Sequence, residues 1–271
     1  MRTGERGGVS SRLERARGVL RLDGGYDGLG SARQSFLRPE RAAGARTMEP
    51  VRLQAPPPLL LENLARIRAL IITMGEMLDQ AIHRATEGLL HRDIAASNEV
   101  IRGDAAVNGL QAETRQMCFT TVLGQDPPAR ELRELLGFQH MSAELERMAD
   151  HCVNIARIAR DLADLPPMSE YVDIPKLSQL VATQVRDMLS ALVVHDVEEA
   201  RAIAARDDLI NRLYHRLVDE LIQLMSDDAE KVYQGTKLIA ACQNYERIGD
   251  RVTNLAEDLV FLESGEIEEL G

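Results

Sequence analysis

The stretch that decides the predicted fold is YERIGDRVTNLAEDLVFL, residues Tyr245–Leu262. Its apolar side chains recur every three or four positions, at Tyr245, Ile248, Val252, Leu255, Leu259 and Leu262. This spacing places one continuous apolar stripe along a helix, the kind that packs against other helices in a bundle. A weaker copy, LERMADHCVNIARIARDL, lies 100 positions earlier at Leu145–Leu162. The two stripes predict two related helices in an all-α fold.

An acidic ladder accompanies each stripe, about 100° further round the helix. It consists of two carboxylates and a carboxamide at positions i, i+4 and i+8: Glu146, Asp150 and Asn154 in the first copy, and Glu246, Asp250 and Asn254 in the second. Carboxylates four residues apart repel each other on an isolated helix. The repeated arrangement therefore predicts a cation site at each ladder. Oxygen ligands favour magnesium, calcium, manganese or oxidised iron. A plain solvated acidic face is the alternative.

The rest of the chain divides into further helical segments around these two. Apolar periodicity and proline breaks predict helices at residues 59–90, 93–123, 130–165, 174–195, 197–225 and 229–263. This order indicates a tandem repeat of two antiparallel three-helix bundles. The predicted domain boundaries are 59–166 for the first repeat, 167–175 for a linker and 176–264 for the second repeat.

The middle helix of each predicted repeat carries an aspartate and an asparagine four residues apart. Asp104 and Asn108 in the first match Asp207 and Asn211 in the second, both at an offset of 103. We expect each aspartate to face the neighbouring ladder and to complete its oxygen cluster. Alternatively, the aspartates are solvated surface acids. The asparagines are either further ligands or hydrogen-bonding links between helices.

Composition and charge exclude several classes of function. The net charge of −11 is unsuited to a nucleic-acid binder, which needs a basic face for the phosphates. The three cysteines are widely spaced and form no thiolate zinc motif; Cys152 falls on the apolar stripe and is expected in the core. No apolar run approaches the roughly 18 to 20 residues of a transmembrane helix. These features predict a cytoplasmic protein.

Residues 1–58 form a basic N-terminal extension with no clear periodicity. Its first 47 residues contain ten arginines and five acidic residues, with frequent glycine. This composition is typical of a disordered segment. The extension is either an arm attracted to anionic membranes or the product of a start codon placed upstream of a true start at Met48.

The motifs ERMAD at Glu146–Asp150 and ERIGD at Glu246–Asp250 resemble the E(D)-x-x-x-D signature of the PhoU family. The resemblance covers about residues 59–262. It implies a membrane-peripheral regulator that lowers phosphate uptake and phosphate-starvation signalling when phosphate is plentiful. The implied partners are the ATPase subunit of the phosphate ABC transporter and a sensor histidine kinase, with a homodimer as the expected assembly. It also implies multinuclear metal clusters, of iron or another divalent cation, with ligands Glu146, Asp150, Glu246 and Asp250 and support from Asp104 and Asp207.

The two copies differ in ways that predict unequal sites. Ala149 stands where the second copy has Gly249, and Arg157 where it has Glu257. A positive charge at Arg157 is expected to weaken metal binding at the first cluster. His151 and His215 have no counterparts in the other copy and are predicted to be surface histidines. No catalytic motif is present, so we expect a non-enzyme; a metal-free helical adaptor and a helical-bundle metalloenzyme are the alternatives.

Overall fold

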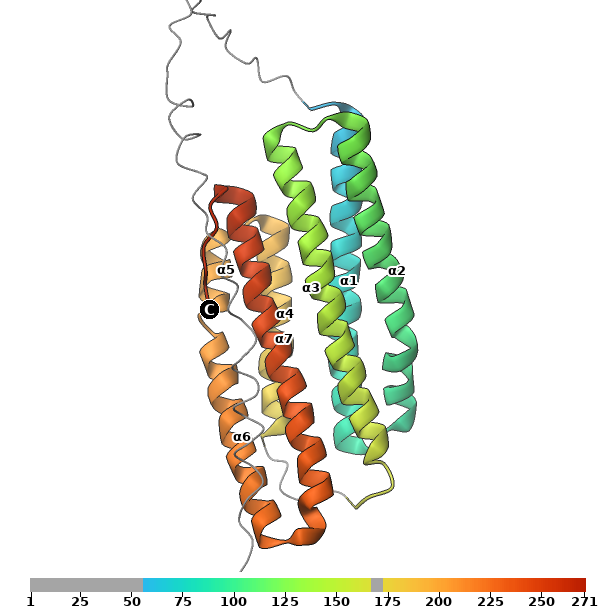
Figure 1. Cartoon of the computed structure of the whole chain (residues 1–271), viewed down its shortest axis with the longest axis vertical. Helices are drawn as coiled ribbons and strands as arrows, with labels where there is room; N and C mark the ends of the chain where they lie inside the picture. The colour runs from blue at the N-terminus through green and yellow to red at the C-terminus, as the bar shows by residue number, and fades with distance from the viewer. Residues whose placement is uncertain (1–55, 167–172) are drawn as a thin grey trace, which may run out of the picture. The chain divides into compact units, whose positions relative to one another are not determined.

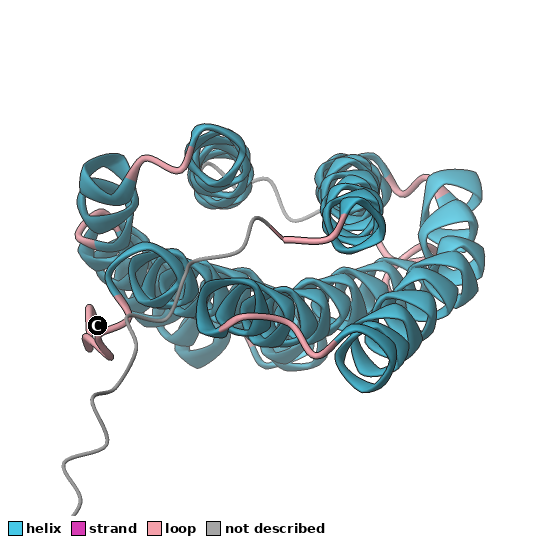
Figure 2. Cartoon of the chain, turned by 90° about the horizontal axis from the view of Figure 1, so that it is seen from above, coloured by secondary structure: helices cyan, strands magenta, loops and turns pink. Residues whose placement is uncertain are grey.

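The computed structural model describes residues 56–166 and 173–271, and within them the regular structure is helical throughout (Figures 1 and 2). The elements are α1 (Pro58–His91), α2 (Ile94–Gln125), α3 (Ala129–Asp161), α4 (Ile174–Val194), α5 (Val197–Ala204), α6 (Asp207–Asp227), the 3-10 turn η1 (Ala229–Lys231) and α7 (Val232–Ser264). The predicted all-α class is confirmed. The predicted extension lies outside the described residues as far as position 55, as does most of the predicted linker at 167–175.

One predicted helix is wrong. The segment 197–225 is broken at Ala205 and Arg206, so that α5 ends at Ala204 and α6 begins at Asp207. The break is held by Arg206, whose guanidinium binds Asp187 on α4 at 2.7 Å and Glu199 on α5 at 3.4 Å. Two acidic residues in the first turn of α6 suit a new helix start, because the N-terminus of a helix carries partial positive charge.

The turns that lead into α2 and α5 are built alike. Each preceding helix ends in a residue with left-handed backbone, Arg92 (φ 58°) and His195 (φ 59°). The next residue caps the following helix with its carboxylate: Asp93 accepts from the N–H of Ala96, and Asp196 from that of Glu199. Asp93 and Asp196 are again 103 positions apart.

The helices pack as two neighbouring groups that meet along α3 and α7. Helices α1, α2 and α3 contact one another, α7 contacts α4, α5 and α6, and α3 lies beside α7 (Figure 1). The apolar residues of both predicted stripes are buried, from fully buried Tyr245 to Leu262 at 8% exposure. The Tyr245 hydroxyl lies 2.7 Å from that of Thr86, which links α7 to α1. All three cysteines are buried free thiols, as predicted for Cys152.

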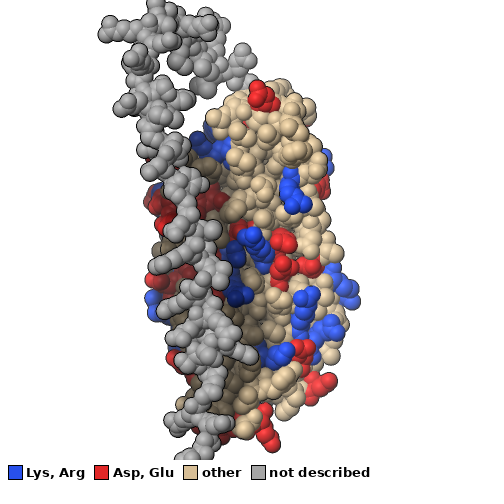
Figure 3. All heavy atoms as spheres, viewed as in Figure 1, with Lys and Arg blue, Asp and Glu red and all other residues tan. Residues whose placement is uncertain are grey.

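The surface gives no sign of segregated charge on the face seen in Figure 3. There, acidic and basic side chains are interspersed over the described helices. Across the described ranges, no helix is both long enough and apolar enough to cross a membrane.

Candidate functional site: two acidic clusters beside the α3–α7 junction

The first acidic cluster is formed by α2 and α3. Asp104 on α2 lies close enough to Glu146 and Asp150 on α3 for their charges to interact. Burial raises the pKa of the Asp104 carboxyl, and the negative charge of Asp150 raises it further. The pKa of Glu146 is raised by burial and then by Asp150 and Asp104. The three carboxylates are therefore near enough to influence one another's protonation.

The second cluster repeats this arrangement on α6 and α7. Burial raises the pKa of Asp207, and Asp250 adds to the rise. Glu246 has a raised pKa for the same reasons, burial first, followed by the charges of Asp250 and Asp207. Burial also raises the pKa of Asp250. The fold thus sorts the six sequence-predicted residues into two triads, each drawn from two neighbouring helices.

Each triad presents a buried carboxylate oxygen that has no hydrogen-bond donor. Asn108 donates to Asp104 Oδ2 at 3.1 Å, and Asn211 donates to Asp207 Oδ2 at 2.7 Å. The other oxygen of each aspartate, Oδ1, is buried and unpartnered. The asparagines hold the aspartates within their own helices, so the alternative prediction that they link helices is wrong.

The chemistry of the triads fits a hard cation. The donors are carboxylate and amide oxygens, the ligands that calcium, magnesium and manganese prefer, and an unpartnered buried carboxylate oxygen is costly without a cation or a donor. Within residues 56–166 and 173–271, no three His, Cys, Asp or Glu side chains are yet arranged to hold a metal ion. Binding at either triad would thus draw its carboxylates closer together.

Arg157 lies near the first cluster, as its position in the sequence predicts. Its charge lowers the pKa of Asp104, against the larger effects of burial and Asp150. Its guanidinium also donates to Asn154 Oδ1 at 3.5 Å. The first cluster therefore contains a cation of its own, whereas Glu257 occupies the matching position on α7.

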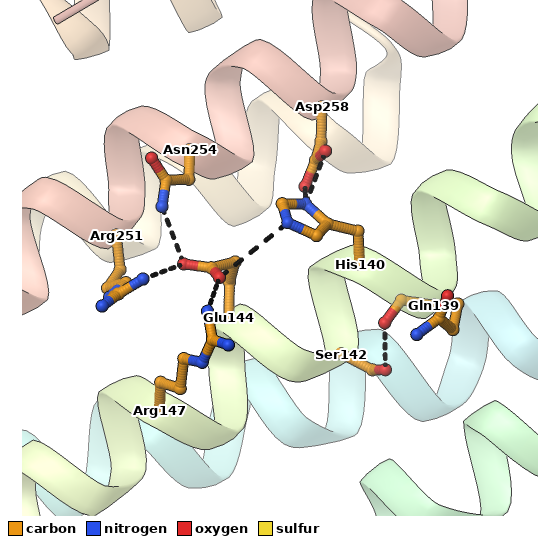
Figure 4. Close-up of polar contacts among 8 residues, drawn as sticks. All are labelled: Gln139, His140, Ser142, Glu144, Arg147, Arg251, Asn254 and Asp258. Atoms are coloured by element: carbon orange, nitrogen blue, oxygen red, sulfur yellow. Dashed lines mark hydrogen bonds and ion pairs between the residues drawn. The ribbon is translucent and has the colours of Figure 1, made fainter. Parts of the chain in front are cut away.

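Between the clusters, α3 and α7 are joined by a buried carboxylate that sequence reasoning missed. The side chain of Glu144 is 1% exposed and accepts from Arg147 at 2.8 Å, from Arg251 at 3.2 Å and from Asn254 at 2.9 Å (Figure 4). Asn254, predicted as the third member of an oxygen ladder, instead donates across the junction. Glu144 precedes the ERMAD motif by two positions, and nothing in its sequence neighbourhood distinguishes it from a solvated acid.

The junction continues at His140 and Asp258. The ring Nδ1 of His140 lies 2.8 and 2.7 Å from the two carboxylate oxygens of Asp258, and the imidazole faces Glu144 on its other side (Figure 4). Burial raises the pKa of Asp258 to about 6, although the hydrogen bond and charge of His140 act in the opposite direction. The ion pairs of Glu144 and the His140–Asp258 pair therefore lie next to each other along the α3–α7 contact.

A neutral version of the same contact lies at the other end of the junction. Asn244 Oδ1 is 3.0 Å from His151 Nδ1 and accepts from Asn154 Nδ2 at 3.4 Å. These residues are the counterparts, 100 positions away, of Glu144, Arg251 and Asn254. His151 is half-buried, and burial lowers its pKa. His151 thus lies at the contact with α7 and keeps part of its surface exposed.

These features define a class of protein: an all-helical bundle with two oxygen-rich clusters flanking one central helix pair. The family model described as "PhoU domain" matches residues 71–159 and 174–259. The chain belongs to the PhoU family, which confirms the resemblance of its ERMAD and ERIGD motifs.

Relatives and solved structures agree with that assignment. The phosphate-specific transport system accessory protein PhoU homolog of Aquifex aeolicus is 32% identical over 208 residues, covering 77% of this chain and 94% of the relative. The homolog from Caulobacter vibrioides is 30% identical over 206 residues, with 76% and 90% covered. The regulatory protein PhoU of Streptococcus pneumoniae superposes with a TM-score of 0.73 at 26% identity, covering 78% of this chain and 100% of that one. PhoU of Pseudomonas aeruginosa, at 24% identity, shares the fold with a TM-score of 0.74, covering 76% and 100%.

Proposed function

We propose that this chain is a non-catalytic accessory protein of a phosphate-specific transport system. It lowers phosphate uptake and phosphate-starvation signalling when phosphate is plentiful. The support is membership of the PhoU family over most of the described residues, with relatives that carry the name of accessory protein. In this proposal the protein acts at the cytoplasmic face of the membrane as a homodimer. It contacts the ATPase subunit of the phosphate ABC transporter and a sensor histidine kinase.

Metal binding is the second part of the proposal. The observation that carries it is the pair of buried, donor-free oxygens, Asp104 Oδ1 and Asp207 Oδ1, each placed beside two further carboxylates. Glu146, Asp150 and Asp104 would hold one multinuclear cluster, and Glu246, Asp250 and Asp207 the other, with iron or another divalent cation. A bound metal supplies positive charge that offsets the repulsion within each triad and ties α2 to α3 and α6 to α7.

One strain experiment tests both parts. Cells lacking the gene receive either the wild-type chain, the double variant Asp150→Ala with Asp250→Ala, or a control variant, Glu113→Ala with Glu220→Ala. The control removes the same charge from two exposed positions, where Glu113 pairs with Arg66 and Glu220 with Arg216. Phosphate uptake is measured in phosphate-rich medium, and the metal content of each natively purified protein is measured by elemental analysis.

We expect uptake to rise without the gene and to fall again with wild-type or control protein, each purified with two or more metal ions per chain. The double variant should be metal-free. Unchanged uptake in the cells lacking the gene would contradict the regulatory role. Metal-free wild-type protein with intact helicity would contradict only the metal-binding part of the proposal. The protein would then be a metal-free helical adaptor.

A further inference from the structure

A buried glutamine on α4 has an amide oxygen without a partner. Gln184 is 3% exposed, and its Nε2 donates to the backbone carbonyl of Ile203 on α5 at 3.3 Å. Its Oε1 is buried and receives no hydrogen bond. The bond to Ile203 orients the amide, since the opposite orientation would bring Oε1 against that carbonyl oxygen. A buried acceptor left in this state costs free energy unless a donor or a cation meets it.

The unpartnered oxygen of Gln184 and that of Asp207 meet at the same point on α7. A methyl group built on Gly249 would lie 2.8 Å from Asp207 Oδ1 and 3.5 Å from Gln184 Oε1. Helices α4 and α6 thus direct two buried oxygens at one position, beside Asp250 in the next position of α7. The amide of Gln184 also lies close enough to Asp207 to lower the pKa of that carboxyl by a hydrogen bond, but its Oε1 has no partner. Two acceptors facing the same space repel each other, and positive charge between them removes the repulsion.

The first half of the chain lacks this oxygen. At the offset of 103 that relates Asp104 to Asp207, the counterpart of Gln184 is Ala81. Ala81, Asp104 and Ala149 line a hollow of about 130 Å³. The two clusters therefore share their carboxylates, whereas the place of the Gln184 oxygen in the second cluster corresponds to a hollow in the first.

We propose that Gln184 Oε1 is an additional, neutral ligand of the second cluster, where it binds a hard divalent cation together with Asp207. The inference rests on the metal-binding part of the proposed function. A neutral amide oxygen adds a ligand without adding a like charge to a triad that already holds three carboxylates. The second cluster is consequently the tighter of the two, and Gln184 adds to the difference that the charge of Arg157 makes at the first cluster.

Calorimetric titration of metal-stripped, full-length protein with manganese(II) chloride tests this assignment. We expect wild-type protein to show two classes of site, of which Asp250→Ala loses the tighter. Gln184→Leu keeps the side-chain size and removes the oxygen. It should weaken the tighter class about tenfold or more, the range that loss of a partner at a metal site usually costs. The weaker class should be unchanged in this variant.

Three further proteins complete the test. Gln184→Glu retains a side-chain oxygen and should bind manganese tightly, unlike Gln184→Leu. This difference distinguishes loss of a ligand from loss of folding. Gln223→Leu, an exposed glutamine on α6, should bind as wild type does. Ala81→Gln should strengthen the weaker class.

The outcomes separate the inference from the proposal beneath it. Wild-type protein that takes up no manganese overturns both. If wild type shows two classes of site and the tighter class is unchanged in Gln184→Leu, the inference alone is overturned. Gln184 would then serve only as a hydrogen-bond donor to Asp207. Equal weakening of both classes would also overturn it, because Gln184 lies at one cluster only.

Discussion

At the scale of single residues, one methyl group distinguishes the two signature helices beside their clusters. Gly249 lets the Asp207 carboxylate approach α7, and the same position on α3 is Ala149. The glycine lies within a regular helix, so its value here is the space that it leaves rather than any special backbone conformation. Close approach of Asp207 to Asp250 depends on that space.

Gly249→Ala should separate stability from metal binding. The added methyl group would lie 2.8 Å from Asp207 Oδ1, so the carboxylate must move. Alanine is favoured over glycine inside a helix by about 1 kcal/mol, which offsets the cost of that movement. We expect a free energy of unfolding within about 1 kcal/mol of wild type, together with weaker manganese binding at the second cluster. Ala149→Gly is the matched control and should lose stability without affecting that cluster.

At the scale of elements, the α3–α7 junction depends on a carboxylate that is removed from water. Glu144 is buried, whereas its partners Arg147 and Arg251 retain partial exposure at their outer ends. Ion pairs of this kind stabilise a contact mainly because an unpaired buried charge is costly. The junction should therefore be sensitive to loss of one partner, in contrast to the exposed ion pairs elsewhere on the helices.

Arg251→Ala should destabilise the fold by about 1 to 3 kcal/mol, because Glu144 stays buried with fewer charged donors. Arg66→Ala removes an exposed pair with Glu113 and should cost less than about 1 kcal/mol. Urea denaturation followed by circular dichroism measures both. Equal costs for the two variants would show that Glu144 is not held by Arg251 in solution.

At the scale of the whole molecule, the dependence of stability on pH should contain a contribution from Asp258. His140, Glu144 and Glu257 face this carboxyl, and burial raises its pKa from 3.8 to about 6. The folded chain therefore keeps the proton of Asp258 at pH values where the unfolded chain has released it. Stability from this group is complete below pH 3.8 and is lost as the pH rises through about 6.

The stability of wild type relative to Asp258→Asn should fall by on the order of 2 kcal/mol between pH 4 and pH 6 and then stay level. Denaturant midpoints of both proteins across this range measure the difference. Asp219→Asn, at an exposed position of α6, serves as the control for removal of a carboxylate charge. A difference that rises with pH would mean that the charge of His140 outweighs burial.

The sequence was sufficient for the helical class, the buried stripes and the grouping of the six acidic residues, because all three follow from spacing along a helix. It could not predict features that depend on partners from other elements. The break before Asp207 depends on Arg206 reaching Asp187 and Glu199. Glu144 and Gln184 read as ordinary polar helix residues, and only the packing of α7 over one and of α5 beside the other buries them.

The break before Asp207 makes the two clusters depend on different parts of the chain. Asp104 lies within the continuous α2. Asp207 is the first residue of α6, directly after a turn that is held by backbone hydrogen bonds to Arg201 and Ile203 and by the ion pairs of Arg206. We therefore expect substitutions in this short turn to alter the second cluster and to leave the first unchanged.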